Sequence, residues 1–316
     1  MTATQNLPPL ELLPRDLGTY RKGNTGVDYV HRFDSGRAGP HVLINALTHG
    51  NEFCGMVAAC HLLDSGVRPL QGKLTVSFAN IAAYESFDPA RPFESRQITH
   101  NLNRVWSEAW LDGPEDSVEL KRAREMRSVV DVADHILDIH STSSDVEPFW
   151  VYPHFERNAA VAAALPLPEV HLMMPAGLGS GTPLIQHGRH GQKDGNAGAA
   201  LVVECGQHFR IASGERAVAV TMAFLRHFGL LAPAPAPAPV QRSRRFELLR
   251  THVVKDADFR FVRPLLGFEV FNQGDLIATD GAEEIRAPCA DCTVFMPTRA
   301  PIVGREGVYL TRPHIG

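Results

Sequence analysis

His49 and Glu52 stand three residues apart in the stretch THGNE, directly after the apolar run 41–47. His140 follows a second apolar run in DIHST, and Glu204 ends a third in VECGQ. Three protein ligands drawn from histidine and carboxylate, with water in the fourth position, are typical of catalytic zinc. Bound zinc lowers the pKa of its water to about 7, so that a nearby glutamate can take the proton. The four residues predict metal-assisted hydrolysis, with His49, Glu52 and His140 as ligands and Glu204 as the base that activates zinc-bound water.

The elements that would hold these residues alternate between short apolar runs and helical patterns. Because parallel strands place their carboxyl ends at one edge of a sheet, this order predicts an α/β fold whose site lies at that edge. Asp138 precedes His140 by two residues in the same expected strand, so both side chains point to one side and Asp138 could orient the histidine. The expected strands are 41–47, 73–80, 135–140, 148–153 and 199–204, and the main expected helices are 53–66, 117–133 and 216–231.

The Ala-Pro repeat at 232–240 is the clearest boundary in the chain. Proline at every second position removes backbone donors and favours a stiff, extended path. We therefore expect a catalytic α/β domain at 1–231, a linker at 232–240 and a smaller domain at 241–316. The last segment contains short strand-like pieces between Gly, Pro and Asp turns, which predicts a compact β domain.

Composition excludes several classes of function. The net charge is −4 and no run of Lys or Arg forms a basic arm, so we expect no nucleic-acid partner. No apolar run approaches the roughly 20 residues needed to cross a bilayer, and the first residues lack the pattern of a secretory signal. Five scattered cysteines argue against a disulfide framework and favour a cytoplasmic location, and the CxxC of Cys289 and Cys292 reads as a turn between strands.

Each motif taken alone has an ordinary interpretation. Most H-x-x-E pairs are surface residues, and a histidine at a strand end is more often structural than a ligand. A second histidine pair, His187 and His190, lies in the Gly-rich segment 175–198. Long Gly-rich loops are often lids or binding loops, so we expect a lid or substrate-facing role for this pair rather than metal binding.

The four motifs THGNE, ESRQITHNLNR, DIHST and VECGQ occur in this order along the chain. In this combination the sequence resembles the aspartoacylase / succinylglutamate desuccinylase family, within the zinc carboxypeptidase superfamily. The resemblance extends over nearly the whole chain. It implies a zinc-carboxypeptidase-like, largely parallel or mixed sheet flanked by helices, with a smaller C-terminal β domain that shapes the substrate entrance. It also implies one zinc ion per chain on His49, Glu52 and His140, and Glu204 as general base.

Further residues match the family's substrate-binding positions. The resemblance implies that Arg96 polarises the scissile carbonyl and holds the oxyanion. It implies that Asn103 and Arg104 bind a substrate carboxylate, for which the planar fork of arginine is suited. In the C-terminal segment REGVYL, Tyr309 resembles a substrate-facing tyrosine.

Two positions depart from the family pattern. Asn101 stands where the family often has aspartate, which changes what could support Arg104. Asp194 stands at the spacing where aspartoacylases have an arginine that reads the second substrate carboxylate, which argues against N-acetylaspartate as the substrate.

The sequence thus predicts a zinc-dependent hydrolase that cleaves the amide bond of an N-acyl amino acid, a small-molecule substrate. A homo-oligomer is compatible with the sequence. The alternatives left open are a zinc carboxypeptidase or esterase of the same superfamily, and a non-catalytic metal-binding protein on this fold.

Overall fold

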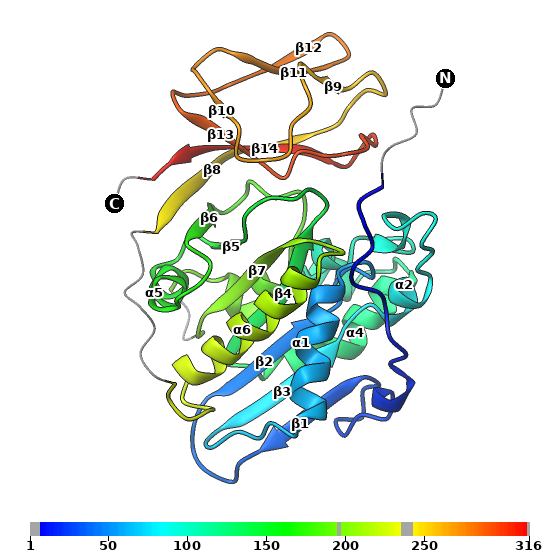
Figure 1. Cartoon of the computed structure of the whole chain (residues 1–316), viewed down its shortest axis with the longest axis vertical. Coiled ribbons are helices and arrows are strands. Elements are labelled where there is room, and N and C mark those ends of the chain that lie inside the picture. The colour runs from blue at the N-terminus through cyan, green and yellow to red at the C-terminus, as the bar shows by residue number, and fades with distance from the viewer. Residues whose placement is uncertain (1–6, 195–196, 235–242, 315–316) are drawn as a thin grey trace.

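A computed structural model describes residues 7–194, 197–234 and 243–314, and within them one large sheet extends through most of the chain (Figure 1). The sheet has 11 strands in the order β1-β3-β2-β4-β7-β5-β6-β8-β14-β13-β10. A separate sheet of 3 strands, in the order β12-β11-β9, covers its C-terminal part. The fold is therefore mixed α/β with a C-terminal antiparallel β region, and the predicted fold class is confirmed.

Four adjacent parallel strands form the part of the sheet that carries the predicted ligands. They are β3 (Lys73–Phe78), β2 (His41–Ala46), β4 (His135–Thr142) and β7 (Ala200–Gln207). β2 is buried along its whole length, as expected for a strand covered on both faces. The antiparallel strand β1 (Val30–Asp34) closes this edge of the sheet.

Helices cover both faces of these strands. α1 (Phe53–Asp64) and α6 (Ile211–His227) lie side by side on one face (Figure 1), and α4 (Val118–Asp131) belongs to the apolar cluster on the other. The residues of β2 alternate between the two clusters, with Ile44 in one and Leu43 in the other. The shorter helices are α2 (Ile81–Glu85), α3 (Glu108–Leu111) and α5 (Glu156–Ala164), and the 3-10 turns are η1 (Gly18–Tyr20), η2 (Glu94–Arg96), η3 (Leu102–Arg104), η4 (Leu184–Gln186) and η5 (Gly188–Gly191).

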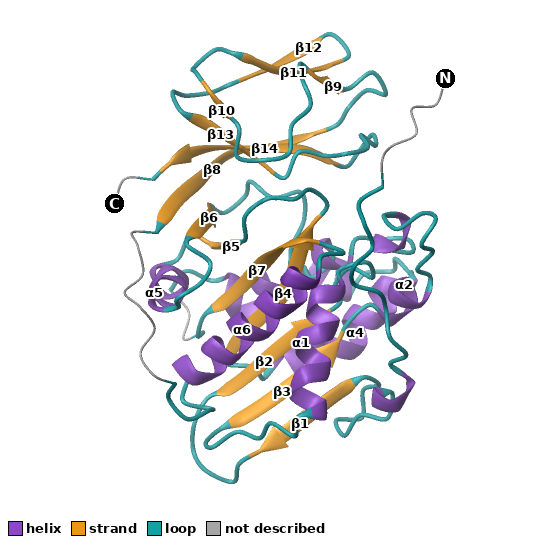
Figure 2. Cartoon of the chain, in the orientation of Figure 1, coloured by secondary structure: helices purple, strands orange, loops and turns teal. Residues whose placement is uncertain are grey.

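The sheet continues from the α/β part into the C-terminal β region (Figure 2). β5 is antiparallel to β7, and β6 pairs with β8 in parallel, so hydrogen bonds join the two regions. The strands are β5 (Phe149–Pro153), β6 (Val170–Met174), β8 (Arg244–Val253), β9 (Arg260–Phe261), β10 (Val270–Phe271), β11 (Leu276–Asp280), β12 (Glu283–Arg286), β13 (Cys292–Phe295) and β14 (Glu306–Pro313).

The expected strands all form, but one helix differs. α6 begins at Ile211 rather than at 216 and ends at His227, before the Ala-Pro repeat. Gly229 adopts a φ of 72°, the left-handed conformation that commonly follows a helix end, so the helix stops without help from proline. Most of the predicted linker, residues 235–240, lies outside the described residues. Every helix in the described ranges is too short or too polar to span a membrane.

Candidate metal and catalytic site

The turn that carries His49 and Glu52 is held by a glycine that no other residue could replace. A Cβ added to Gly50 would lie 2.3 Å from the carbonyl carbon of Ala83 and 2.4 Å from the carbonyl oxygen of Ser95. Gly50 also donates its N–H to the carbonyl oxygen of Arg96 at 3.1 Å. The close approach fixes the metal-ligand turn, residues 47–52, against the segment that carries Arg96.

The three predicted ligands converge in the structure. Nδ1 of His49 lies 2.8 Å from Oε1 of Glu52, and Nδ1 of His140 lies 2.9 Å from Oε2 of the same carboxylate. One ligand atom from each residue lies within 4.8 Å of the others, and all three side chains are buried. This His-Glu-His group can hold a metal ion.

The outer nitrogens of both histidines have acceptor partners that determine which nitrogen faces the group. Nε2 of His49 lies 2.9 Å from Oδ1 of Asn101, and Nε2 of His140 lies 2.8 Å from Oδ2 of Asp138. Asp138 is itself held by Nδ2 of Asn45 at 2.8 Å. Because these oxygens accept, each Nε2 carries a proton, and Nδ1 is the nitrogen that would face a metal ion. The predicted orienting contact from Asp138 to His140 is present.

The charges around the group favour a cation. Burial alone would lower the pKa of His140, but the carboxylates of Asp138 and Glu52 outweigh it and raise this pKa well above the usual range. Burial alone would likewise raise the pKa of Glu52, but His49 and His140 hold it well below the usual range. A position that stabilises a positive charge between buried carboxylates suits a divalent ion, so the residues present fit a metal.

Glu204 stands beside this group on the neighbouring strand. In the β4–β7 register it lies directly opposite His140. Burial raises the pKa of Glu204 to about 8, against the opposing charge of His140. Its Oε2 is buried and has no hydrogen-bond partner among the described residues. A buried carboxyl group with a free oxygen and a raised pKa is suited to exchanging a proton near neutral pH.

Arg96 and Asn103 lie on the segment that faces the ligand turn. Nη1 of Arg96 donates to Oε1 of Glu52 at 2.9 Å, and its side chain is 36% exposed. Its other guanidinium N–H groups make no hydrogen bond to the described residues. Oδ1 of Asn103 accepts from the backbone N–H of Leu184 at 3.0 Å, which leaves its Nδ2 without a protein partner in the described part of the chain. Both residues thus keep donors for a ligand.

Arg104 has a partner that the sequence did not reveal. Its Nη2 donates to both carboxylate oxygens of Glu306, at 2.9 and 2.7 Å, and to the hydroxyl of Tyr309 at 3.2 Å. Nε also contacts Glu306, at 3.0 Å, and Nη1 donates to the carbonyl oxygen of Asn103 at 2.7 Å. Burial opposes ionisation of Glu306, but Arg104 lowers its pKa to about 2. The carboxylate-binding fork of Arg104 is therefore filled by a carboxylate of the chain itself.

Two further residues at the site were missed in the sequence. The side-chain oxygen of Asn101 contacts Nε2 of His49, a contact that the departure from the family's aspartate did not indicate. Nδ1 of His208 lies 2.8 Å from the hydroxyl of Ser141, whose backbone N–H donates to Oε2 of Glu52 at 3.2 Å. His208 lies in the same ECGQH stretch as Glu204, so that stretch carried the signal for it.

The histidine pair of the Gly-rich segment lies elsewhere. Nε2 of His187 contacts Oδ1 of Asp131 at 3.0 Å, and Nε2 of His190 contacts the carbonyl oxygen of Ala133 at 3.1 Å. Ala133 precedes β4, whereas His140 lies near the other end of that strand. Both histidines are buried, so the expected lid or substrate-facing role is wrong for them. They pack at the amino-terminal end of β4, opposite to the end that carries His140.

His190 leads to a prediction about acid stability. Burial lowers its pKa to about 4 from an ordinary value of 6.5. The unfolded chain therefore binds more protons between these values, so the free energy of unfolding falls as the pH drops through this window. In His190→Gln the amide can still donate to the carbonyl oxygen of Ala133. We expect the free energy of unfolding of this variant to fall by roughly 2 kcal/mol less than that of the wild type between pH 7 and pH 4.5. Urea unfolding of both proteins at the two pH values measures this difference. Equal decreases in the free energy of unfolding would contradict the prediction.

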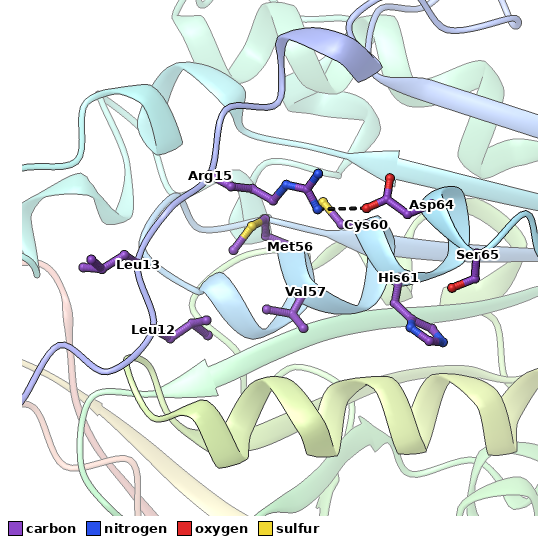
Figure 3. Close-up of a pocket in the computed structure, with 9 residues that line it drawn as sticks. All are labelled: Leu12, Leu13, Arg15, Met56, Val57, Cys60, His61, Asp64 and Ser65. Carbon is purple, nitrogen blue, oxygen red and sulfur yellow. Dashed lines mark hydrogen bonds and ion pairs between the residues drawn. The ribbon is translucent and has the colours of Figure 1, made fainter.

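Of two hollows in the described part of the chain, one borders Ser180, whose hydroxyl contacts Nε of Arg104. A hollow of about 270 Å³ is bordered by residues 177–180 and by β8, next to the contact between Ser180 and Glu306. The other, of about 370 Å³, lies between the N-terminal segment and α1 (Figure 3). Its lining residues are Leu12, Leu13, Arg15, Met56, Val57, Cys60, His61, Asp64 and Ser65. None of them belongs to the metal-ligand group or contacts Glu204.

Residues 38–212 match the family model described as succinylglutamate desuccinylase/aspartoacylase catalytic domain. This span is more than half of the chain and contains His49, Glu52, His140 and Glu204. The chain belongs to this family of deacylating hydrolases, and the predicted membership is confirmed. A comparison with curated protein sequences finds no match.

Solved structures with related folds cover nearly the whole chain. A succinylglutamate desuccinylase from Vibrio cholerae has a TM-score of 0.71 and 18% identity, over 91% of this chain and 86% of that one. A succinylglutamate desuccinylase from Chromobacterium violaceum has a TM-score of 0.66 and 20% identity, over 92% and 90%. The product-bound ectoine utilization protein EutE (DoeB) from Ruegeria pomeroyi has a TM-score of 0.60 and 19% identity, over 88% and 86%. At these identities the likeness is one of fold.

Proposed function

We propose that this protein is a zinc-dependent hydrolase that cleaves the amide bond of an N-acyl amino acid. The observation that carries the proposal is the convergence of His49, Glu52 and His140 beside Glu204, whose carboxyl group is buried and has a free oxygen. The family and the printed names of the related structures, two of them succinylglutamate desuccinylases, support a deacylase. Two His nitrogens and one carboxylate match the ligand preference of catalytic zinc.

The proposed mechanism assigns one role to each polar group. His49, Glu52 and His140 would hold a zinc ion, which would supply Lewis-acid activation of water and of the acyl carbonyl. Glu204 accepts a proton from the attacking water and passes it to the leaving amine. Arg96 directs its free N–H groups at the carbonyl oxygen and stabilises the negative charge that develops there. The Arg96–Glu52 contact at 2.9 Å supports this role, because it places the guanidinium beside a ligand.

We propose that Asn103, Arg104 and Tyr309 bind the carboxylate of the amino-acid half. The bidentate face of Arg104 already holds Glu306, and leaving that buried carboxylate unpaired would be costly. A substrate carboxylate is therefore expected to use Nδ2 of Asn103, the hydroxyl of Tyr309 and the remaining Nη1 proton of Arg104. This arrangement keeps the ion pair intact.

We also propose that residues 241–316 act as a β domain that shapes the substrate entrance, with 1–231 as the catalytic domain and 232–240 as the linker. Glu306 and Tyr309 of β14 support this division of labour, because both reach Arg104 from the C-terminal region. A mouth narrowed in this way would exclude long peptides, which favours a deacylase over a carboxypeptidase. We propose a cytoplasmic location from the five scattered cysteines, and no nucleic-acid partner from the net charge of −4. No membrane partner is proposed, because no apolar run is long enough to cross a bilayer, and a homo-oligomer is compatible with the sequence.

A substrate screen tests the proposal. Zinc-loaded protein is assayed against N-acetyl and N-succinyl derivatives of acidic and neutral amino acids, their ester analogues, and short peptides with free C-termini. We expect hydrolysis of at least one N-acyl amino acid, at a kcat/KM at least tenfold above that of any peptide. A preference for peptides would favour the carboxypeptidase, and metal binding without hydrolysis of any compound would favour a non-catalytic protein.

A further inference from the structure

Glu119, in the first turn of α4, is a fully buried carboxylate that the proposed mechanism does not use. Its Oε1 accepts from the backbone N–H of Ile98 at 2.6 Å and from Nδ2 of Asn80 at 3.3 Å. Its Oε2 accepts from the backbone N–H groups of Thr99 and His100 at 3.2 and 3.1 Å. One side chain thus binds three consecutive backbone donors of a loop that is distant in sequence.

No lysine, arginine or histidine forms an ion pair with Glu119 in the described part of the chain. Its charge is balanced by N–H dipoles of the loop and by its place at the N-terminal end of α4, where a negative charge is favourable. Residues 97–100 lie outside the helices and strands, so Glu119 is the group of the described chain that holds the backbone N–H groups of residues 98–100. The carboxylate therefore determines the path of this loop.

The loop 97–100 joins two residues that contact the metal ligands. Arg96 precedes it and donates to Oε1 of Glu52 at 2.9 Å. Asn101 follows it and contacts Nε2 of His49 at 2.9 Å. A shift of the loop would move both contacts together, and with them the ligand carboxylate and one ligand imidazole.

We propose that Glu119 is a positioning residue that holds Arg96 and Asn101 against the metal-ligand turn, and thereby sets both metal affinity and turnover. Its effect on turnover rests on the proposed function, whereas its effect on metal affinity and on the loop does not. Glu119 acts through Arg96 and Asn101 and touches neither metal nor substrate.

The test is Glu119→Gln, which keeps the shape of the side chain but replaces one acceptor oxygen by an amide donor. The amide NH₂ of the glutamine takes the place of either Oε1 or Oε2. The two donors that bonded to that oxygen then face another donor, so the loop loses hydrogen bonds. We expect the dissociation constant for Zn²⁺ to rise about tenfold, as for other residues that orient metal ligands. We expect kcat to fall by about 10- to 100-fold, with KM changed by less than about threefold. Amide hydrogen exchange at 98–100 should accelerate in the metal-free protein.

Glu125→Gln on the same helix is the matched control, because Glu125 is exposed and forms a surface ion pair with Arg122. This control should leave the dissociation constant for Zn²⁺, kcat, KM and the hydrogen exchange at 98–100 unchanged. Glu119→Asp keeps a carboxylate and is the second test variant if the glutamine variant does not fold. Because its side chain is shorter, we expect smaller changes in zinc affinity, kcat and hydrogen exchange, in the same direction. A variant that loses thermal stability but keeps wild-type zinc affinity and wild-type exchange at 98–100 would overturn the proposal. If wild-type protein hydrolyses nothing, the zinc and exchange readouts still decide it.

Discussion

Glu204→Gln is expected to abolish hydrolysis while leaving the metal bound. The amide has the same shape as the carboxyl group but cannot accept the proton of the attacking water. Because general-base catalysis contributes about 10²- to 10⁴-fold, kcat should fall by that amount. Glu204 is not in the His-Glu-His group, and among the described residues its Oε2 has no hydrogen-bond partner that the substitution could disturb.

The comparison requires both kcat and zinc content, measured on the same preparation of variant and wild type. Elemental analysis should find equal zinc per chain in the two proteins. Glu156→Gln, at the start of α5, controls for the loss of a carboxylate far from the ligand group. If the Glu204 variant retains more than a tenth of the wild-type kcat, Glu204 is not the base.

His140→Ala is expected to remove metal binding and to destabilise the fold. It removes one of three ligands and leaves Glu52 and Asp138 as buried carboxylates without the imidazole between them. Breaking a buried charged network in this way typically costs about 3–5 kcal/mol. The affinity for Zn²⁺ should fall by at least about 100-fold, because even residues that only orient ligands contribute 10- to 100-fold.

Zinc titration and urea unfolding of the metal-free protein measure the two effects separately. His171→Ala removes a buried histidine that bonds to Tyr152, outside the metal-ligand group. It should lower stability without changing the zinc affinity. Wild-type zinc affinity in His140→Ala would show that His140 is not a ligand.

The sequence predicts the core of the candidate site because its residues sit at strand ends. His140 and Glu204 are 64 positions apart, yet each ends an apolar run that reads as a buried parallel strand. Parallel pairing then brings them into register without any detailed packing information. The same argument places Asp138 on the side of His140, where the structure has it.

Contacts outside the parallel strands could not be predicted in this way. Arg104 and Glu306 are 202 positions apart, and their pairing depends on how the C-terminal strands join the sheet through β6 and β8. Neither residue lies in a periodic segment, so no pattern indicates the contact. For His187 and His190 the sequence pattern misled. Their spacing suggested a functional pair, but they pack near the end of α4, at the amino-terminal end of β4 and away from His140.

We propose that zinc bound by His49, Glu52 and His140 is required for the deacylase activity of this chain. The most direct measurement is the rate of hydrolysis of the best N-acyl amino acid as Zn²⁺ is added back to chelator-treated protein. We predict that activity is absent without metal, rises in proportion to added zinc and reaches its plateau at one ion per chain. Full activity in the metal-free protein, or no activity at any zinc content, would contradict a zinc-dependent mechanism.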